Sequence, residues 1–207
     1  MFFKQLRATI RQAKKNDPSA PTKITIFFTY PGIHALMWYR VAHFFYQIKL
    51  TFIARIISNL GRFFTNVDIH PGAKIGEGLF IDHGAGVVIG QTAVIGKNVV
   101  LFHGVTLGSS SVQSQGKRHP TLEDNVVVYA NSTIIGNITI GKNSVVGASS
   151  VVKQDIGPNS VVVGNPIRLI SVDGKRVYDA KTECEALKDE LTTLRVKIQE
   201  LEERLSK

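Results

Sequence analysis

The sequence predicts a mainly β fold: a left-handed parallel β-helix that follows an N-terminal helical cap and precedes a C-terminal coiled-coil helix. Three observations predict it. Aliphatic residues recur every six positions in the middle of the chain, apolar residues before them recur at three-to-four spacing, and those after them follow a heptad. The expected boundaries are residues 1–66, 67–170 and 177–205.

The first segment is expected to be helical because its apolar residues recur at helical spacing. The series comprises Ile33, Leu36, Met37, Val41, Phe44, Phe45, Ile48, Phe52, Ile53, Ile56, Ile57 and Leu60. Breaks are expected at Asp17-Pro18 and at Tyr30-Pro31-Gly32. Basic residues interrupt the stretch 24–64, so it has no run of about 20 apolar residues to span a bilayer. We expect buried helices rather than membrane attachment.

The middle segment carries a hexapeptide signature. Its aliphatic residues are Ile69, Ile75, Ile81, Ile89, Ile95, Leu101, Leu107, Leu122, Val128, Ile134, Ile140, Val146 and Val152, and the phase slips by two between Ile81 and Ile89. Each hexad is expected to form one short strand and one corner, so that three hexads close a triangular coil around an aliphatic core. Corners favour Gly and Asn, which tolerate unusual backbone angles. The alternative, a sandwich of short strands, would not keep one period for so long.

A polar segment, residues 109–121, interrupts this period. It cannot face the core, so we expect a loop that leaves the β-helix. Such loops often hold binding and catalytic residues. This one carries Lys117, Arg118 and His119.

The last segment predicts a coiled coil. Its heptad comprises Val177, Ala180, Cys184, Leu187, Leu191, Leu194, Ile198, Leu201 and Leu205. A lone helix would leave this seam in water, so we expect a parallel three-stranded coil. The alternative is a helix that folds back on its own subunit. Cys184, the only cysteine, cannot form an intrachain disulfide, which favours a reducing, cytoplasmic location.

The charge pattern limits the classes of partner. The net charge of +9 would suit an acidic partner, but the basic residues are scattered and no nucleic-acid-binding motif accompanies them. We therefore expect no nucleic-acid partner, and part of the positive charge is available to an anionic cofactor. Charged residues appear too early at the N-terminus for a secretory signal.

Several polar residues are not needed by the scaffold. They are Asp68 with His70, Asp82 with His83, His103, and Arg118 with His119. Acyl transfer to an alcohol needs a base near the hydroxyl, and histidine suits that role at neutral pH. A carboxylate such as Asp68 or Asp82 can orient the histidine ring. Arg118 is suited to bind a carboxylate through two hydrogen bonds.

Several stretches of the sequence together resemble the serine O-acetyltransferase family. They are Tyr30-Pro31-Gly32-Ile33-His34-Ala35, Tyr39-Arg40-Val41-Ala42-His43, Asp68-Ile69-His70-Pro71-Gly72-Ala73-Lys74-Ile75-Gly76, Ile81-Asp82-His83-Gly84, Gly104-Val105-Thr106-Leu107-Gly108, Lys117-Arg118-His119-Pro120 and Val163-Gly164-Asn165-Pro166. They cover roughly residues 15–170. Generic hexapeptide acyltransferases share the β-helix but lack this helical cap and the paired Asp-His-Gly and Arg-His-Pro motifs.

The resemblance implies transfer of an acetyl group from acetyl-coenzyme A to the hydroxyl of L-serine. The transfer would be direct, without an acyl-enzyme, and would give O-acetylserine for cysteine biosynthesis. His83 would be the general base and Asp68 its orienting acid, while His119 would assist at the reacting oxygen.

The resemblance also implies binding residues for both substrates. Arg118 would hold the carboxylate of serine, and Asp82 together with Asp17 would receive its ammonium group. Acetyl-CoA would lie in a groove between subunits, near Gly108, Ala130 and Ala148. The site would be shared by adjacent subunits of a homotrimer, and no metal is implied.

The chain departs from the family at four places. Gln91 stands where Glu is usual, Ser109-Ser110-Ser111 where Gly-Thr-Gly is usual, and His103 and Ala130-Asn131-Ser132 also differ. An acceptor other than serine, bearing an amino or hydroxyl group, therefore stays open. The coiled coil replaces the short extension that often docks on cysteine synthase, and we do not predict that complex.

Two further alternatives belong to other classes of protein. One is a non-catalytic trimeric scaffold whose coiled coil recruits a partner. The other is a zinc carbonic anhydrase of the same fold, which would need three converging histidines. The candidate ligands are His70, His83, His103 and His119.

Overall fold

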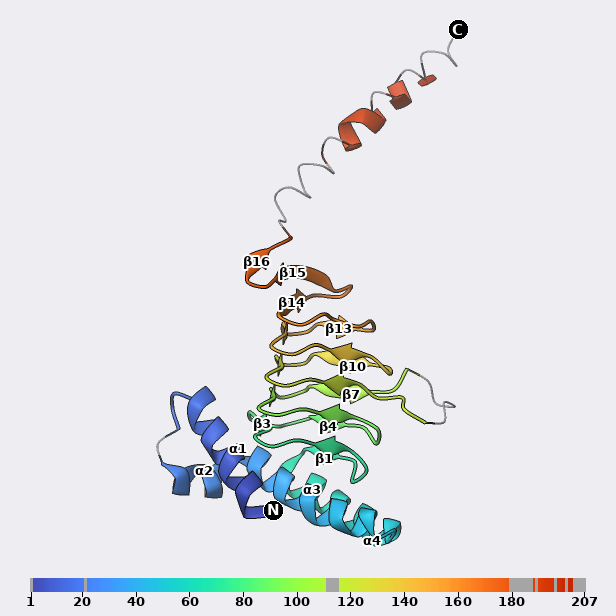
Figure 1. The fold of residues 1–207 in the computed structure, drawn as a ribbon. Coiled ribbons are helices and arrows are strands. Elements are labelled where there is room, and N and C mark those ends of the chain that lie inside the picture. The colour runs from blue at the N-terminus through green and yellow to red at the C-terminus, as the bar shows by residue number, and fades with distance from the viewer. Residues whose placement is uncertain are drawn as a thin grey trace.

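A computed structural model describes residues 2–20, 22–110, 116–178, 188, 190–195, 197–199 and 201–202. Four helices lie at one end of a prism of short strands, and the C-terminal residues leave from the other end (Figure 1). The prism is a left-handed parallel β-helix, so the predicted fold class is confirmed.

Each side of the prism is one sheet. Sheet 1 contains β1 (Asp68–Ile69), β4 (Val88–Ile89), β7 (Thr106–Gly108), β10 (Thr133–Ile135) and β13 (Val151–Val152). Sheet 2 contains β2 (Lys74–Ile75), β5 (Val94–Ile95), β8 (Thr121–Leu122) and β11 (Thr139–Ile140). Sheet 3 contains β3 (Phe80–Ile81), β6 (Val100–Leu101), β9 (Val127–Val128), β12 (Val145–Val146), β14 (Ser160–Val163), β15 (Arg168–Val172) and β16 (Lys175–Arg176). Three consecutive strands therefore complete one triangular coil.

The aliphatic residues of the six-residue period form the predicted core. In sheet 1, Ile89 is in register with Leu107, and Leu107 with Ile134. All three side chains are buried. Because each strand is so short, the stacking of coils, rather than the width of any sheet, provides the continuous core.

A ladder of side-chain amides holds the corner between sheets 2 and 3. Asn125 Nδ2 donates to Asn143 Oδ1 at 3.0 Å, and Asn143 Nδ2 donates to Asn159 Oδ1 at 2.9 Å. Asn159 Nδ2 donates to Asp173 Oδ1 at 2.8 Å. The φ angles of these four residues lie between 49° and 60°, a region that Asn and Asp tolerate better than most residues. The corners therefore select asparagine for both its backbone and its side chain.

The N-terminal helices are α1 (Phe2–Asn16), α2 (Lys23–Thr29), α3 (Pro31–Gln47) and α4 (Thr51–Thr65). The two predicted breaks are confirmed, because α1 ends before Asp17 and α3 begins at Pro31. The break between α3 and α4 was not predicted. It contains neither Pro nor Gly, and Lys49 makes the turn with φ 66°.

Gly32 lets α3 approach the end of the prism. A Cβ on Gly32 would overlap the carbonyl oxygen of Ile81, the last residue of β3. Tyr39 Oη donates to the carbonyl of Ala73 at 2.6 Å, which fastens α3 to the first coil. The helices thereby cover the open lower end of the core and lie beside the turn that follows β3.

The expectation that the apolar residues of the helical segment are buried is wrong for α4. Its buried positions hold the small residues Ala54, Ser58, Gly61 and Thr65. They are small because α3 is close: a Cβ on Gly61 would lie 2.7 Å from the Cβ of Trp38. The large apolar side chains of α4 are exposed instead. Helical spacing identifies the helix but not which face is covered.

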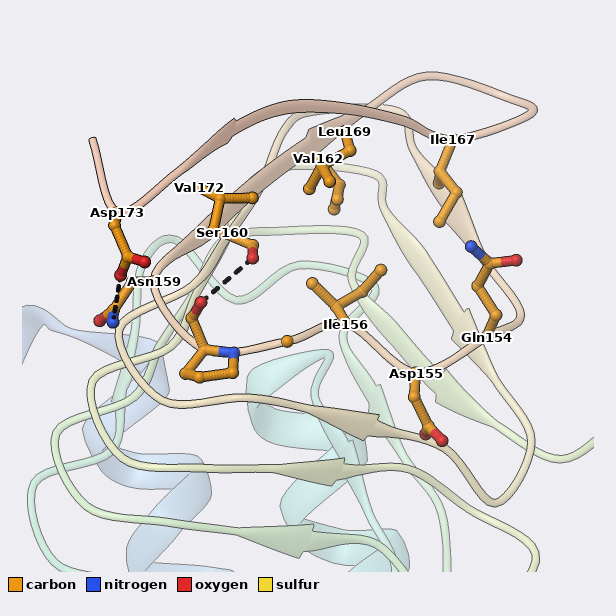
Figure 2. A pocket seen from close by; sticks show the side chains of 12 residues that line it. Gln154, Asp155, Ile156, Asn159, Ser160, Val162, Ile167, Leu169, Val172 and Asp173 are labelled. Carbon is orange, nitrogen blue, oxygen red and sulfur yellow. Dashed lines mark hydrogen bonds between the residues drawn. The ribbon is translucent and has the colours of Figure 1, made fainter. Parts of the chain in front are cut away.

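The upper end of the prism contains a cavity of about 480 Å³, lined by residues between Gln154 and Asp173. Antiparallel pairing of β15 with β14 brings the chain back over this end. Figure 2 shows Ile156 and Val162 at the cavity, with the Asn159–Asp173 hydrogen bond at its rim. None of the predicted site residues lines it.

Within the predicted coiled coil, residues 188, 190–195, 197–199 and 201–202 are helical. The expected start at Val177 is wrong, because Val177 and Tyr178 are not helical and the backbone N–H of Val177 donates to the carbonyl of Ile170 at 2.9 Å. Leu191, Leu194, Ile198 and Leu201 are each more than half exposed, between 51% and 57%, so the seam is open to solvent in the single chain. The other seam positions Ala180, Cys184, Leu187 and Leu205 lie outside the described residues. No helix among the described residues has both the length and the apolar content to cross a membrane.

Candidate active site

The predicted site residues of the β-helix lie along two edges of the prism. The His83 edge, between sheets 3 and 1, carries Asp82, His83, His103, Ala130 and Ala148. The His119 edge, between sheets 1 and 2, carries His70, Gly90, Gly108, Lys117, Arg118 and His119. Hydrogen bonds stack the turns along each edge, for example Asn131 N to His103 O at 2.9 Å and Gly136 N to Gly108 O at 3.1 Å. One chain therefore keeps His83 and His119 on different edges.

His83 lies in the turn that follows β3. Its φ is 59°, a conformation that non-glycine residues seldom adopt outside functional or tightly constrained turns. Its Nε2 is 3.9 Å from Asp82 Oδ2, and its ring meets that of His103 edge-on with centroids 6.1 Å apart. The side chain is 76% exposed, so the ring is accessible to a substrate or a second subunit.

The helical cap brings Asp17 to the His83 edge. Tyr30 Oη donates to Asp17 Oδ2, and Ser19 donates to Oδ1 through its backbone N–H at 2.8 Å and its hydroxyl at 2.6 Å. The bonds from Ser19 and Tyr30, with a smaller effect of His83, lower the pKa of Asp17. The bond to Asp17 raises the pKa of Tyr30 to about 12, and Asp82 adds to that rise. Asp17 is therefore a carboxylate at neutral pH, near enough to His83 for the charge of one to affect the other.

Sequence reasoning gave no role to Tyr30. It treated Tyr30-Pro31-Gly32 as a helix break and as part of a family resemblance. The structure shows that the tyrosine hydroxyl positions the carboxylate of Asp17, 13 residues earlier. A tyrosine at a helix boundary carries no sequence signal for such a bond.

The structure pairs Asp68 with a residue that was not expected. Asp68 Oδ2 accepts a hydrogen bond from Arg62 Nη1 at 3.3 Å. The carboxylate beside the His83 imidazole is Asp82, whose Oδ2 lies 3.9 Å from Nε2, too far for a hydrogen bond. The orienting role expected for Asp68 therefore rests on the family resemblance.

Thr92 holds His119 and determines its tautomer. Thr92 Oγ1 accepts the backbone N–H groups of Arg118 at 2.9 Å and His119 at 3.1 Å, so its own hydrogen is available to Nδ1 of His119, 2.9 Å away. The backbone N–H of Thr92 also donates to this Nδ1, at 3.2 Å. Because Nδ1 accepts, the network assigns the proton of the neutral ring to Nε2.

The protonation state of His119 agrees with this network. Burial, followed by the charges of Arg118 and Lys117, lowers the pKa of His119. At neutral pH the ring is therefore uncharged and presents Nε2–H as a hydrogen-bond donor. Such a group can stabilise a developing negative charge without first losing a proton.

Arg118 is positioned by a neutral partner. Its Nη2 donates to Gln91 Oε1 at 2.7 Å, and Gln91 Nε2 donates to Tyr46 Oη at 3.1 Å. An amide orients the guanidinium without neutralising it, so the positive charge stays available to an anion. Lys117 Nζ donates to the carbonyls of Thr92, at 3.0 Å, and His119, which holds this end of segment 109–121 on the prism. Residues 111–115 lie outside the described residues.

The three residues expected to contact acetyl-CoA are small and lie on both edges of the prism. A Cβ on Gly108 would make only ordinary contacts, 3.4 Å from Thr106 Cγ2 and 3.9 Å from Ile135 Cγ1, so packing does not require glycine there. A hollow of about 370 Å³ beside it is lined by Ser109, Ser110, Ile135, Gly136, Asn137, Ile138 and Lys153. Ala148 is exposed and Ala130 half-buried on the other edge. Lys153 contributes a positive charge to the lining of this hollow.

The described residues contain no group of three His, Cys, Asp or Glu side chains that could hold a metal ion. The candidate histidines are divided, with His70 and His119 on one edge and His83 and His103 on the other. Nδ1 of His70 is already used, because it accepts the backbone N–H of Gly72 at 2.9 Å. Within a single chain, therefore, three histidines do not converge among the described residues as zinc would require.

Comparisons with known proteins agree with the fold. Residues 119–154 match the family model described as bacterial transferase hexapeptide (six repeats). A serine acetyltransferase of Bacillus licheniformis is 44% identical over 177 residues, which cover 86% of this chain and 82% of that protein. One of Helicobacter pylori strain 26695 is 47% identical over 168 residues, or 81% and 98% of the two chains.

Solved structures agree as well. The serine acetyltransferase of Brucella abortus in complex with coenzyme A has a TM-score of 0.80 and 36% identity, over 84% of this chain and 69% of that chain. The serine acetyltransferase of Neisseria gonorrhoeae in complex with serine has a TM-score of 0.79 and 37% identity, over 82% of this chain and 69% of that chain.

A hexapeptide β-helix with imidazoles and a guanidinium on its edges defines the class: a β-helical acyltransferase. Sequence identities above 40% over most of both chains identify the member of that class. The chain belongs to the serine acetyltransferase family.

Proposed function

We propose that this chain transfers the acetyl group of acetyl-CoA to the hydroxyl of L-serine, giving O-acetylserine for cysteine biosynthesis. The observation that carries the proposal is the division of the site residues between two edges. On each edge, polar groups lie in the coils nearer the helical cap, and small residues lie farther along the prism. A homotrimer that sets the His83 edge of one subunit against the His119 edge of the next completes the set in each of three identical interfaces.

In this site the two charged ends of serine have separate partners. Arg118 binds the carboxylate, since Gln91 leaves its charge unneutralised. Asp17 and Asp82 receive the ammonium group on the other side of the interface. The lowered pKa of Asp17 keeps its charge in place at neutral pH. A sugar acceptor has neither charged group, so this pairing favours an amino acid.

The histidines divide the chemistry. His83 removes the proton of the serine hydroxyl as its oxygen attacks the acetyl carbon, and returns that proton to the departing sulfur. Acetyl-CoA supplies the acyl group already activated as a thioester. His119 donates Nε2–H to the oxygen on which negative charge develops. No residue of the chain becomes acylated, because the serine hydroxyl attacks directly.

Two carboxylates compete for the role of orienting His83. We retain Asp68, which the family resemblance implies, and Asp82 is the carboxylate nearer to the ring in the single chain. Kinetics distinguishes them. Loss of the orienting acid lowers kcat, whereas loss of an ammonium ligand raises KM for serine. We expect Asp68→Asn to lower kcat and Asp82→Asn to raise KM for serine.

The remaining parts of the chain support this site. The groove between edges would hold acetyl-CoA against Gly108, Ala130 and Ala148. Residues 1–66 act as the helical cap that supplies Asp17, residues 67–170 as the catalytic β-helix, and residues 177–205 as a coil that joins three subunits. The lone cysteine suits a reducing cytoplasm.

A thiol-release assay with acetyl-CoA tests the acceptor. We expect serine to be preferred over homoserine, threonine and amino sugars, and His83→Ala to lose at least about 100-fold in kcat, the scale for removal of a general base. Near-normal turnover by His83→Ala would refute the assignment of the base.

Mixed trimers test the shared site. His83→Ala and His119→Ala are each expected to be nearly inactive as pure trimers. When the two variants are unfolded together and refolded at equal amounts, about a quarter of the interfaces combine an intact His83 with an intact His119. Recovery of activity near that fraction supports the proposal. Mixed trimers that stay inactive would place both histidines in one subunit's site.

A further inference from the structure

One face of α4 is apolar and uncovered in the chain. Its side chains are Phe52, Ile53, Ile56, Leu60, Phe63 and Phe64, with exposures from 41% for Ile53 to 81% for Phe63. At 3.6 residues per turn they fall within an arc of about 120°. We call these six residues the α4 apolar face.

This face is directed away from the prism. The opposite side of α4 is the buried one, where Ser58 Oγ donates to the carbonyl of Ile69 in β1 at 2.8 Å. Figure 1 shows α4 at the end of the molecule opposite the C-terminal helix. The α4 apolar face is therefore clear of the coil, and it is separate from the two edges that carry the site residues.

The charge around the face is mainly positive, and in the part of the chain that the structure describes the one carboxylate paired with its basic residues is Asp68, 3.3 Å from Arg62 Nη1. Residues 1–67 contain ten Lys and Arg but a single acidic residue, Asp17. Lys49, Arg55 and Arg62 are exposed on α4 or directly before it. Two copies of this surface placed face to face would oppose like charges, whereas an anionic surface would be attracted. The charge therefore argues against a second copy and for an acidic partner.

We propose that α4 docks on an anionic phospholipid bilayer. The α4 apolar face enters the boundary between headgroups and acyl chains, and the flanking basic residues contact the headgroups. An amphipathic helix with Phe and Leu on one face and Lys and Arg beside it is the pattern of helices that lie in a membrane interface. The 15 residues of α4 lie on the bilayer rather than span it, in agreement with the lack of a spanning helix among the described residues.

This inference revises an expectation made from the sequence. Membrane attachment was set aside because 24–64 has no run of about 20 apolar residues to span a bilayer and because its apolar residues were expected to be buried inside the protein. The structure shows that the large apolar side chains of α4 are exposed, so burial does not account for them. In the proposed trimer, parallel prisms would place three α4 helices at the same end, so that three weak contacts act together. The side edges with the proposed serine site would remain open to solvent.

Vesicle co-sedimentation of the full-length protein tests the inference. We expect binding to vesicles that contain phosphatidylserine, much weaker binding to pure phosphatidylcholine, and loss of binding at high salt. The double variant Phe52→Ser, Phe63→Ser should lower the vesicle partition coefficient at least about tenfold, because two exposed phenyl groups no longer enter the interface. Arg55→Gln should lower it less and reduce its salt dependence.

Leu169→Ser is the matched control, because Leu169 is also exposed, at 43%, but lies in β15 near the other end of the prism. It should bind vesicles like the parent. Acetyl transfer by every variant checks folding, since none of these residues belongs to the proposed site. Absence of vesicle binding by the parent, or equal loss in the Leu169→Ser control, overturns the inference. A parent whose mass exceeds one trimer, and which the double variant reduces to one trimer, also overturns it in favour of contact between copies.

Discussion

The imidazole of His119 lies directly against Gly90. A Cβ on Gly90 would overlap Cδ2 and Nε2 of the His119 ring. Gly90 follows Ile89, the last residue of β4, whose side chain is buried in the core. Thr92, two residues later, holds Nδ1 of the same ring. The stacked coils of sheet 1 therefore fix the position of His119 from two sides.

This contact predicts that Gly90→Ala lowers activity. The added methyl group must displace the ring, and a shift of about 1 Å at a catalytic group can cost up to about 100-fold in kcat. We expect a fall of about 10- to 100-fold in the thiol-release assay. Gly157→Ala is the control, because its Cβ would be 3.8 Å from the nearest atom, Ser160 Oγ. A fully active Gly90→Ala enzyme would show that the position of His119 does not limit turnover.

Thr92 offers a second way to disturb the same ring. Thr92→Val keeps the shape of the side chain but removes the hydroxyl that accepts two backbone N–H groups and reaches Nδ1 of His119. We expect kcat to fall about tenfold, because the ring loses the bond that orients it. Thr92→Ser retains the hydroxyl and should stay active. Equal rates for the two variants would contradict the role given to this hydroxyl.

The pH dependence of stability should report on His70. Burial, followed by the charge of Arg55, lowers the pKa of His70 to about 4, whereas an unfolded histidine titrates near about 6.5. Between these values the unfolded chain binds a proton that the folded chain does not, so stability falls as pH decreases from about 6.5 to about 4. Above that window the group has no effect.

His70→Asn should reduce this pH dependence. The asparagine can still accept the Gly72 N–H through its side-chain oxygen, so the turn is kept. We expect the Tm of the variant to change less than that of the parent between pH 7 and 4.5, values chosen to bracket most of this window. The lowered pKa of His119 leaves part of the slope in both proteins. Identical slopes would mean that His70 is not desolvated as the structure indicates.

The sequence predicted the β-helix because its signal is repeated. Each hexad places one aliphatic residue in the core, and residues such as Leu107 and Ile134 are stacked as the period requires. The exposed face of α4 could not be predicted in the same way, because a helical period looks the same on a covered and an uncovered face. What decides the face is the close approach of α3 at Gly61, a contact between two helices.

For the candidate site, the sequence indicates which residue types take part more readily than which partners hold them. Motifs identified His83, Arg118 and His119 as candidate site residues, because the chemistry of an imidazole or a guanidinium depends on the side chain itself. The residues that hold them, such as Thr92 and Tyr30, are ordinary in sequence. Their roles follow from hydrogen bonds across 26 residues, between Arg118 and Thr92, and across 13 residues, between Tyr30 and Asp17. No local pattern encodes such contacts.

The amide ladder predicts a stability difference between two substitutions of Asn143. Asn143→Ala loses the hydrogen bonds to Asn125 and Asn159. It also places alanine, which has a Cβ but no polar side chain, at φ 59°. We expect a loss of about 2–4 kcal/mol. Asn143→Gly loses the same bonds but adopts this φ freely, and should lose about 1–2 kcal/mol less. Urea unfolding measures the free energy of unfolding of each variant. Equal losses in the two variants would show that the backbone at this position is not strained.

In the proposed trimer, the charges of the C-terminal helix would determine the register in which its copies pair. Heptad positions a are Leu191 and Ile198, and positions d are Leu194 and Leu201. Positions g are then Glu190 and Lys197, and positions e are Arg195 and Glu202. In a parallel coil in register, each g residue meets the e residue five positions later in the neighbouring helix. Both pairs, Glu190 with Arg195 and Lys197 with Glu202, are then of opposite charge.

Replacing Glu190 with Arg and Lys197 with Glu makes both pairs repulsive in all three interfaces of a trimer. Each exposed pair contributes only about 0.3–0.5 kcal/mol, but the effect is repeated, so trimer dissociation should occur at concentrations at least about tenfold higher. Replacing Arg195 with Glu and Glu202 with Lys in the same chain reverses the partners and should restore the parent value. Analytical ultracentrifugation measures each dissociation constant. If the double and quadruple variants match the parent, the helix does not pair in this register, and a helix that folds back on its own subunit becomes the better account of the exposed seam.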